Sequence, residues 1–142
     1  MTCRIAISII NYRTASMTIE CIRSVLSDIG DLDAHVVVVD NASGDGSADH
    51  IAGWIAEQPA GTPVTLVRSA SNTGFSGGHN QGMAAIAADH YLLLNSDALL
   101  RTGFLRTVLH AADTNPQAGL IAPRIETEDG AVQVNCFRLH SP

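Results

Sequence analysis

The sequence "VVVVDNASGDGS" occupies residues 36–47. Its four consecutive valines form an apolar run without alternation, which is typical of a strand covered on both faces. Asp40 ends the run, and a segment of small and polar residues leads to Ser47, a residue type that favours a helix N-cap. A strand, a polar strand end and a helix start in this order predict one unit of a parallel α/β sheet.

The same plan repeats along the chain. Further apolar runs occupy residues 5–10, 64–67 and 91–94, and each is followed by a polar residue. The residues that end the runs follow one another at intervals of about 28 positions, the size of one β-α-β unit. They are Asn11, Asp40, Arg68 and Asn95. We therefore predict an open, mostly parallel α/β sheet flanked by helices, with these residues meeting at its ligand-binding edge.

Helical periodicity fills the intervals between the runs. The apolar stripes at helical spacing are Ile22, Val25, Leu26 and Ile29; Ile51, Trp54 and Ile55; the weaker Met83, Ile86 and Ala87; and Leu105, Val108, Leu109 and Ala112. Residues 115–116, Asn-Pro, end the last predicted helix. A fifth strand is expected at residues 120–122, and Asp129-Gly130 predicts a hairpin turn into a strand at 132–137.

Composition indicates a folded globular domain, which we expect to span residues 1–142. Hydrophobic residues make up 46% of the chain and charged residues 15%. The net charge of -6 argues against a nucleic-acid partner, although backbone amides and a metal ion can still neutralise a small phosphorylated ligand. The apolar run at 5–10 is too short for a transmembrane segment. Three widely spaced cysteines, Cys3, Cys21 and Cys136, indicate reduced thiols and a cytoplasmic protein.

Two strand ends leave their function open. Asp40 either accepts hydrogen bonds from a ribose or a base, or caps the turn that follows it, while Asn41 and Ser43 are expected to form that turn. The predicted loop at residues 72–80 contains Gly74, Gly77 and Gly78. It either admits a phosphate to the start of the next helix or is an ordinary flexible loop.

Asn95-Ser96-Asp97 is the sharper signal. Alternate residues of an extended segment point the same way, so Asn95 and Asp97 are expected to face one ligand together. A carboxylate there can hold Mg²⁺ or Mn²⁺, which completes its shell with phosphate oxygens and water. The alternative is that Asp97 caps a turn, but its position on the same sheet edge as Asp40 favours the ligand.

Other site patterns are missing from the sequence. No glycine fingerprint follows the first strand, which counts against a dinucleotide-binding oxidoreductase or flavodoxin-like domain, and the chain contains no lysine for a P-loop. Neither G-x-S-x-G nor H-E-x-x-H occurs. The histidines lack ligand spacing, and only His79, within the glycine-rich segment, is a candidate for the site.

Together these motifs resemble family 2 glycosyltransferases of the GT-A fold, and within them the rhamnosyltransferase-like members. The segments that carry the resemblance are "ISIINYRT" at 7–14, "VVVVDNASGDGS" at 36–47, "NTGFSGGHNQGM" at 72–83, "YLLLNSDALL" at 91–100 and "APRI" at 122–125. They cover nearly the whole chain, and their combination is specific although no single one is.

The resemblance implies a nucleoside-diphosphate sugar donor, dTDP- or UDP-linked, and a divalent cation, Mg²⁺ or Mn²⁺. It places Asp40 against the nucleoside and Asp97 on the metal, in a D-x-D-like motif whose first carboxylate is replaced here by Asn95. The donor-binding residues implied by the resemblance are Asn11, Asp40, Asn72, Gly74, Asn80 and Asn95.

The resemblance also implies inverting transfer of a hexosyl or rhamnosyl group to a carbohydrate or lipid-linked acceptor. That reaction would serve bacterial cell-surface polysaccharide synthesis, in the cytoplasm or at the inner face of the membrane. The family's acidic general base lies in a later half of the protein, and only residues 138–142 follow Phe137. We therefore expect this chain to be the donor-binding portion, lacking the half that bears the base and the acceptor site. The alternative function is a nucleotide-binding module without transferase activity of its own.

Overall fold

The computed structural model describes residues 3–127 and 129–133 of the 142-residue chain. The chain divides into two compact units, Met1–Thr102 and Gly103–Pro142. We describe each unit by itself, and the interpretation of residues 1–142 as a single domain stays a prediction. In the part of the chain that the structure describes, no helix is both long and apolar enough to cross a membrane.

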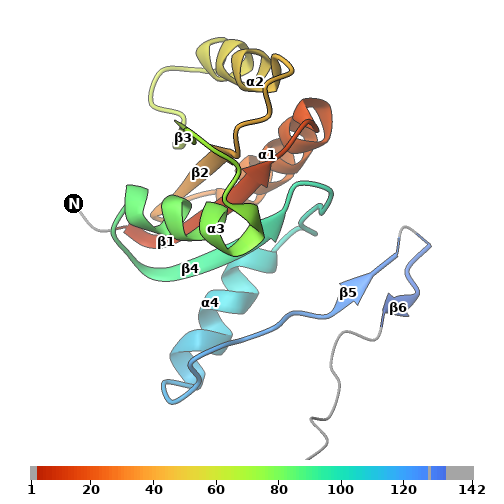
Figure 1. The fold of residues 1–142 in the computed structure, drawn as a ribbon. Coiled ribbons are helices and arrows are strands. Elements are labelled where there is room, and N and C mark those ends of the chain that lie inside the picture. Colours follow the sequence, from red (N-terminus) through yellow and green to blue (C-terminus); the bar gives the residue numbers. More distant parts are fainter. Residues whose placement is uncertain (1–2, 128, 134–142) are drawn as a thin grey trace, which may run out of the picture. The chain divides into compact units, whose positions relative to one another are not determined.

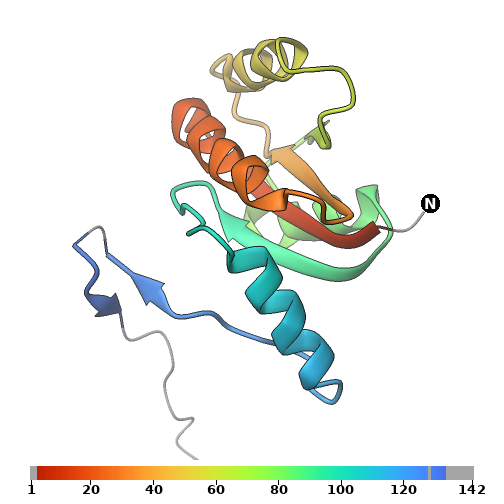
Figure 2. The same cartoon turned by 180° about the vertical axis from the view of Figure 1, so that it is seen from behind.

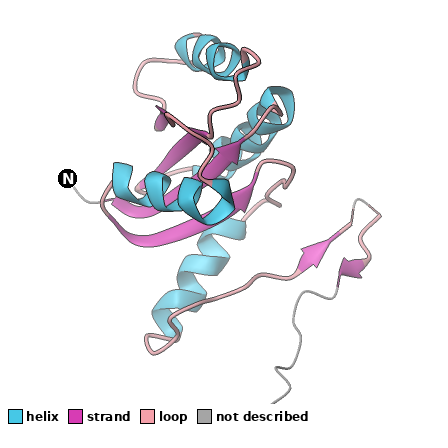
Figure 3. Cartoon of the chain, in the orientation of Figure 1, coloured by secondary structure: helices cyan, strands magenta, loops and turns pink. Residues whose placement is uncertain are grey.

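The first unit is a parallel sheet with helices on both faces. Its strands lie in the order β3-β2-β1-β4, and all three neighbouring pairs are parallel. The strands are β1 (Cys3–Asn11), β2 (Ala34–Asp40), β3 (Val64–Arg68) and β4 (Ala88–Asn95), and the helices α1 (Ala15–Ile29), α2 (Ser47–Ala56) and α3 (Gly74–Ala85). Helix α3 covers one face (Figure 1), while α1 and α2 lie on the other (Figure 2). The alternation of strands and helices in Figure 3 confirms the predicted α/β class.

The core lies on the two central strands. The four valines at 36–39 and Ile7 and Ile9 are at most 1% exposed, as expected for strands covered on both faces. The prediction was wrong for the run at 91–94, because β4 is an edge strand. Tyr91 and Leu93 are 40% and 46% exposed, and the burial of β4 alternates along the strand.

Helix α2 begins one residue away from its predicted cap. Ser47 is the first helical residue, and Gly46, with φ 87°, occupies the N-cap position. Asp45 lies just before it and accepts a hydrogen bond from the Ser47 backbone N–H at 3.0 Å. The helix start therefore uses a carboxylate two residues upstream in place of a Ser47 side-chain cap.

Helix α3 replaces most of the predicted glycine-rich loop. It begins at Gly74, so of residues 72–80 only the first two precede it. A Cβ at Gly78 would come within 2.9 Å of Ile10, and one at Gly82 would collide with the Ser8 hydroxyl. These glycines therefore let α3 pack closely on β1, a requirement of helix–sheet packing that loop flexibility does not explain.

The second unit contains helix α4 (Phe104–Thr114) and a short antiparallel hairpin of β5 (Ile125–Glu126) and β6 (Val132–Gln133). The end of the helix before residues 115–116 and the hairpin turn at Asp129-Gly130 agree with prediction, and Gly130 has φ 84°. Residues 120–122 form no strand, so this expectation was wrong. The predicted strand residues 134–137, and Cys136 with them, lie outside the described residues.

Candidate functional site

The ends of the four strands form a row at one edge of the sheet. The register pairs Asn11 with Asp40, and Asp40 with Arg68. Asn95 at the end of β4 lies beside Ile10 of β1. The predicted convergence of polar strand ends is therefore confirmed.

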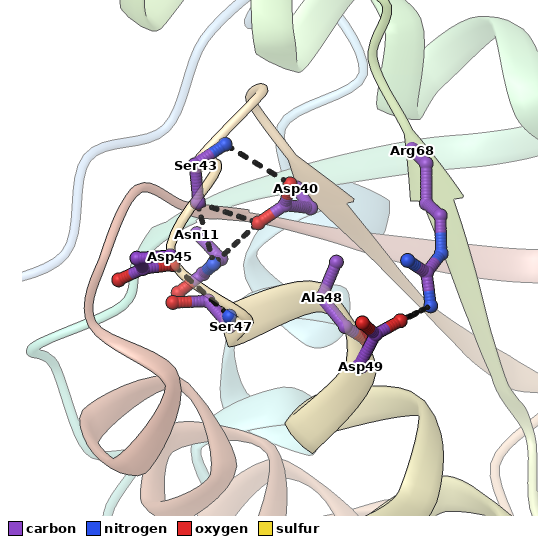
Figure 4. Close-up of polar contacts among 8 residues, drawn as sticks. All are labelled: Asn11, Asp40, Ser43, Asp45, Ser47, Ala48, Asp49 and Arg68. Atoms are coloured by element: carbon purple, nitrogen blue, oxygen red, sulfur yellow. Dashed lines mark hydrogen bonds and ion pairs between the residues drawn. The ribbon is translucent and has the colours of Figure 1, made fainter.

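Asn11, Asp40 and Ser43 form a buried hydrogen-bonded cluster in this row (Figure 4). The Asn11 Nδ2 donates to Asp40 Oδ1 at 2.6 Å and to Ser43 Oγ at 3.1 Å. The Ser43 hydroxyl and backbone N–H donate to Asp40 at 2.6 and 3.2 Å. Three donors thus offset the burial of the Asp40 carboxylate, which is 5% exposed. The geometry agrees with Asp40 as the cap of its turn, and its contact with a donor nucleoside stays a prediction.

The Asn11 side chain also fixes the start of α1. Its Oδ1 accepts from the Thr14 backbone N–H at 3.2 Å and from the Thr18 hydroxyl at 3.0 Å. Asn11 is 0% exposed, and both ends of its amide are used inside the fold. In this arrangement Asn11 positions two loops, while direct contact with a donor stays a prediction.

Two loops at the row hold non-glycine residues in left-handed backbone. Arg13 has φ 61° and Ala42 has φ 58°, a conformation that costs roughly 1–3 kcal/mol per residue. Arg13 ties the two loops together, because its backbone N–H donates to Ser43 Oγ and its Nε to the Ser43 carbonyl, both at 3.0 Å. Its guanidinium also lies 5.0 Å from the centre of the Tyr12 ring. Sequence patterns did not single out Arg13, since a lone arginine after a strand has no distinguishing spacing.

Asn41 joins the end of β2 to the segment before α3. Its Nδ2 donates to Asn72 Oδ1 at 3.0 Å and to the Gly74 carbonyl at 3.1 Å. Its Oδ1 accepts from the Thr73 backbone N–H at 3.0 Å. Asn41 is 3% exposed. The sequence predicted only that it forms a turn, whereas its side chain also binds the segment before α3. The exposed Asn72 and Gly74 are thereby held beside the end of β2, and their part in donor binding stays a prediction.

Asn95, Ser96 and Asp97 form a turn, and the predicted extended conformation was wrong. The Ala98 N–H donates to the Asn95 carbonyl at 3.1 Å, closing the turn. The Ser96 hydroxyl lies 3.4 Å from the Thr14 hydroxyl of the loop before α1. Asn95 and Asp97 still reach one site, because both are exposed and line the same hollow.

Two side chains of helix α1 contact this turn and the residues that follow it. The Cys21 thiol lies 3.5 Å from the Asn95 carbonyl, and the Ser24 hydroxyl accepts from the Leu100 N–H at 3.1 Å. Burial, with a smaller effect of the Asp97 charge, raises the pKa of the Cys21 thiol to about 12. Cys21 is therefore an unreactive structural thiol.

The hollow beside the turn has a volume of about 270 Å³. Its walls combine apolar and aromatic side chains with a few polar groups, and they come from β1, α1, α3 and β4. They are Ile10, Tyr12, Thr14, Met17, Phe75, His79, Leu94, Asn95, Ser96 and Asp97. Asn80 is exposed but does not line this hollow, and its part in donor binding stays a prediction.

His79 is the buried polar residue of the hollow. It is 2% exposed, and its Nδ1 lies 2.9 Å from the Ser8 hydroxyl of β1. Its Nε2 is buried and has no hydrogen-bond partner among the described residues. Burial lowers the pKa of His79, so the ring is neutral at neutral pH. The sequence made His79 a candidate because it lies among glycines, and in the structure it lines the hollow.

A larger hollow of about 490 Å³ lies at the opposite edge of the sheet, against Ile29, Ala34 and Pro63. We favour the smaller hollow as the site, because ligands of open α/β sheets bind at the carboxyl ends of the strands.

Metal binding at the site would depend on Asp97. Of the residues that line the smaller hollow it alone carries a carboxylate, and the described residues include no group of three or more potential metal ligands of the His, Cys, Asp or Glu type. One carboxylate with the neighbouring Asn95 amide suits Mg²⁺ or Mn²⁺, ions that take most of their ligands from phosphate oxygens and water. The donor set therefore fits a cation that arrives with a phosphorylated ligand.

Comparison with known proteins shows the family of this chain. A family model described as glycosyl transferase family 2 matches residues 6–135. No curated protein sequence matches the chain.

Solved structures share the fold at low sequence identity. A mannosyltransferase from Pyrobaculum calidifontis, in complex with GDP-Man and Mn²⁺, matches with a TM-score of 0.67 and 22% identity over 81% of this chain and 33% of its own. S. aureus TarS 1-349 matches with a TM-score of 0.66 and 16% identity over 80% of this chain and 33% of its own. The same protein is also known in complex with UDP-GlcNAc. The chain thus has the fold of these structures and spans about a third of their length.

Proposed function

The chain belongs to glycosyl transferase family 2, and we propose that its first unit binds the nucleoside-diphosphate sugar donor of an inverting, metal-assisted glycosyltransferase. One observation carries the proposal. A closed polar cluster around Asp40 and an exposed carboxylate, Asp97, meet at one edge of a parallel sheet. The first offers a rigid base for a nucleoside, and the second offers a charge for a cation and diphosphate.

The donor would lie along this edge. We place its nucleoside, uridine or thymidine, over the row at Asp40 and beside Asn72 and Gly74. Its diphosphate would extend toward Asp97, and the Arg13 guanidinium stands close enough to the row to offset part of the negative charge.

The transfer would make one bond and break one at the anomeric carbon, and would move one proton. The acceptor hydroxyl oxygen bonds to the anomeric carbon, the bond from that carbon to the diphosphate oxygen breaks, and a carboxylate base takes the hydroxyl proton. A bound Mg²⁺ or Mn²⁺ supplies positive charge beside the leaving diphosphate. Asp97 would hold that ion at the edge of the sheet, and no residue of this chain is assigned the role of general base.

The wider function follows from the family resemblance. We propose a hexosyl or rhamnosyl transferase acting on a carbohydrate or lipid-linked acceptor in bacterial polysaccharide synthesis. The free thiols of Cys3 and Cys21 suit a cytoplasmic protein, working at the inner face of the membrane where such acceptors lie.

Calorimetric titration tests the proposal. UDP, dTDP and GDP would be titrated with and without Mn²⁺ into the wild type, into Asp97→Asn, and into Asp33→Asn as a matched exposed carboxylate at the opposite edge. We expect Mn²⁺ to tighten binding of at least one diphosphate in the wild type and in Asp33→Asn. Asp97→Asn should weaken that Mn²⁺-dependent binding by about tenfold or more. Equal Mn²⁺ effects in all three proteins, or no binding at all, would contradict the proposal.

A further inference from the structure

The starting point is the unpaired nitrogen of His79. A buried polar atom without a partner is unfavourable, because its desolvation is not compensated. In the described residues, His79 Nε2 is the one buried side-chain nitrogen or oxygen in this position. The residue lines the hollow that also contains Asp97, and its unpaired Nε2 is itself buried.

Ser8 selects which nitrogen of His79 carries the proton. Among the described residues, the Ser8 hydroxyl has one hydrogen-bond partner, His79 Nδ1, at 2.9 Å. A hydroxyl that donates to Nδ1 leaves the proton of a neutral imidazole on Nε2. The two ring nitrogens point away from each other, so the Nε2–H is directed away from β1. We assign the Ser8 hydroxyl as the donor because it has no other partner among the described residues, and in this tautomer His79 is a neutral hydrogen-bond donor at Nε2.

The surroundings of this donor suit an uncharged ligand group. Ile10, Phe75 and Met17 give the hollow apolar walls, and its one charged lining residue is the acidic Asp97. A phosphate against these apolar walls would lose hydration without compensation, whereas a sugar ring offers an apolar face together with hydroxyl oxygens.

We propose that His79 is a specificity-determining residue whose Nε2–H donates a hydrogen bond to a hydroxyl oxygen of the sugar carried by the donor. This inference rests on the proposed function. The Phe75 ring packs edge-on against the imidazole, with ring centres 4.5 Å apart, and is itself 59% exposed. Because Nε2 is buried, the proposed contact requires a neighbouring side chain to move when the sugar enters, and the exposed Phe75 is the candidate.

Two variants of His79, with side chains of similar size, separate the effect of the hydrogen-bond donor from the effect of packing. Gln keeps an N–H donor near the position of Nε2, and Met keeps the volume without the donor. His50→Met at an exposed position of α2 is the matched surface control. Each protein would be titrated, with Mn²⁺, with UDP-N-acetylglucosamine, GDP-mannose and dTDP-rhamnose, and with the three diphosphates alone. The quantity compared is the ratio of the Kd of the diphosphate to the Kd of its sugar nucleotide.

For the sugar nucleotide that the wild type binds best, His79→Met should lower this ratio about 3- to 10-fold, the worth of one hydrogen bond between uncharged groups. The Kd of the diphosphate alone should stay unchanged in that variant. His79→Gln should recover most of the ratio, and His50→Met should leave it unaltered. Proton and nitrogen NMR of the wild type adds a second readout. The Nε2–H resonance of His79 should shift with the sugar nucleotide and not with the diphosphate.

The outcomes distinguish this inference from the proposed function. If the diphosphates bind but His79→Met leaves the ratio unchanged, the sugar contact is wrong and donor binding stands. If His79→Met does not fold, the NMR measurement on the wild type decides. An Nε2–H resonance that does not shift when the sugar nucleotide is added overturns the inference. If no diphosphate binds to the wild type, the proposed function fails and the His79 contact fails with it.

Discussion

The cluster around Asp40 and the hollow beside Asp97 lie at the same edge of one sheet, but they use their polar groups differently. The Asp40 carboxylate is buried and accepts three hydrogen bonds from within the fold. In the hollow, Asp97 is exposed and His79 Nε2 has no partner among the described residues. The polar groups at this edge therefore differ in role. Those around Asp40 build the loops, and those of the hollow are the ones that we propose contact a ligand.

Removing each carboxylate in turn tests whether Asp40 and Asp97 differ in their contribution to stability. Asp40→Ala should lower the free energy of unfolding by about 3 kcal/mol, because the donors of Asn11 and Ser43 lose a buried charged acceptor. Asp97→Ala should change it by less than about 0.5 kcal/mol, as expected for an exposed side chain. Urea unfolding followed by circular dichroism measures both. Equal losses would mean that the two regions do not differ in this way.

A glycine pair tests whether the hollow is built by close helix packing. Gly82→Ala should destabilise the protein by about 2 kcal/mol, because the new methyl group collides with the Ser8 hydroxyl that orients His79. Gly53→Ala in α2 is the control, since a Cβ there meets no atom within 4 Å. That control should be neutral or stabilising by up to about 1 kcal/mol. Similar thermal midpoints for the two variants would contradict the packing argument.

The buried imidazole should also make stability depend on pH. Burial holds the pKa of His79 below its ordinary value of 6.5, so below that value the unfolded chain binds a proton that the folded protein does not. The stabilising contribution is present above pH 6.5 and is lost as the pH falls through the folded pKa. Wild-type protein should therefore lose more unfolding free energy between neutral and mildly acidic pH than His79→Gln. His35, whose pKa burial also lowers, is common to both proteins and cancels. A larger loss in His79→Gln would contradict the assignment.

The smallest expected effect is that of the Asp97 charge on the reactivity of the Cys21 thiol, which contacts the turn at Asn95. With the Cys21 pKa raised to about 12 from 9.0, alkylation by iodoacetamide in mildly alkaline buffer should be slow in the folded protein and fast in urea. Cys3→Ser and Cys136→Ser substitutions leave Cys21 as the only thiol to follow by mass spectrometry. Asp97→Asn should speed the reaction only slightly, since burial is the larger cause of the raised pKa. Rapid labelling of the folded protein would show that the turn opens.

The strands could be predicted from the sequence because long apolar runs ending in polar residues report burial and chain direction directly. Register then brings Asn11, Asp40 and Arg68 into one row without further information. The start of α3 could not be predicted in the same way. Glycine has low helix propensity, and Gly78 and Gly82 are helical here because tertiary packing on β1 requires them.

The same limit applied to the side chains of the site. Asn41 cross-links two segments that are some thirty positions apart in the sequence, which no local pattern encodes. The turn at Asn95–Asp97 departs from the extended geometry because Thr14 and Cys21 of a distant segment hold it. Asp97 was identified by its place after a strand, and that signal did not depend on the local conformation.

Donor binding can be located by chemical-shift mapping of the full chain with a sugar nucleotide and Mg²⁺. We expect the largest backbone amide shifts at Asn95–Asp97, at Asn72 and Gly74 and at His79, with small shifts for Ala34 at the opposite edge. Shifts concentrated around the larger hollow, at Ile29, Ala34 and Pro63 and their neighbours, would contradict this expectation.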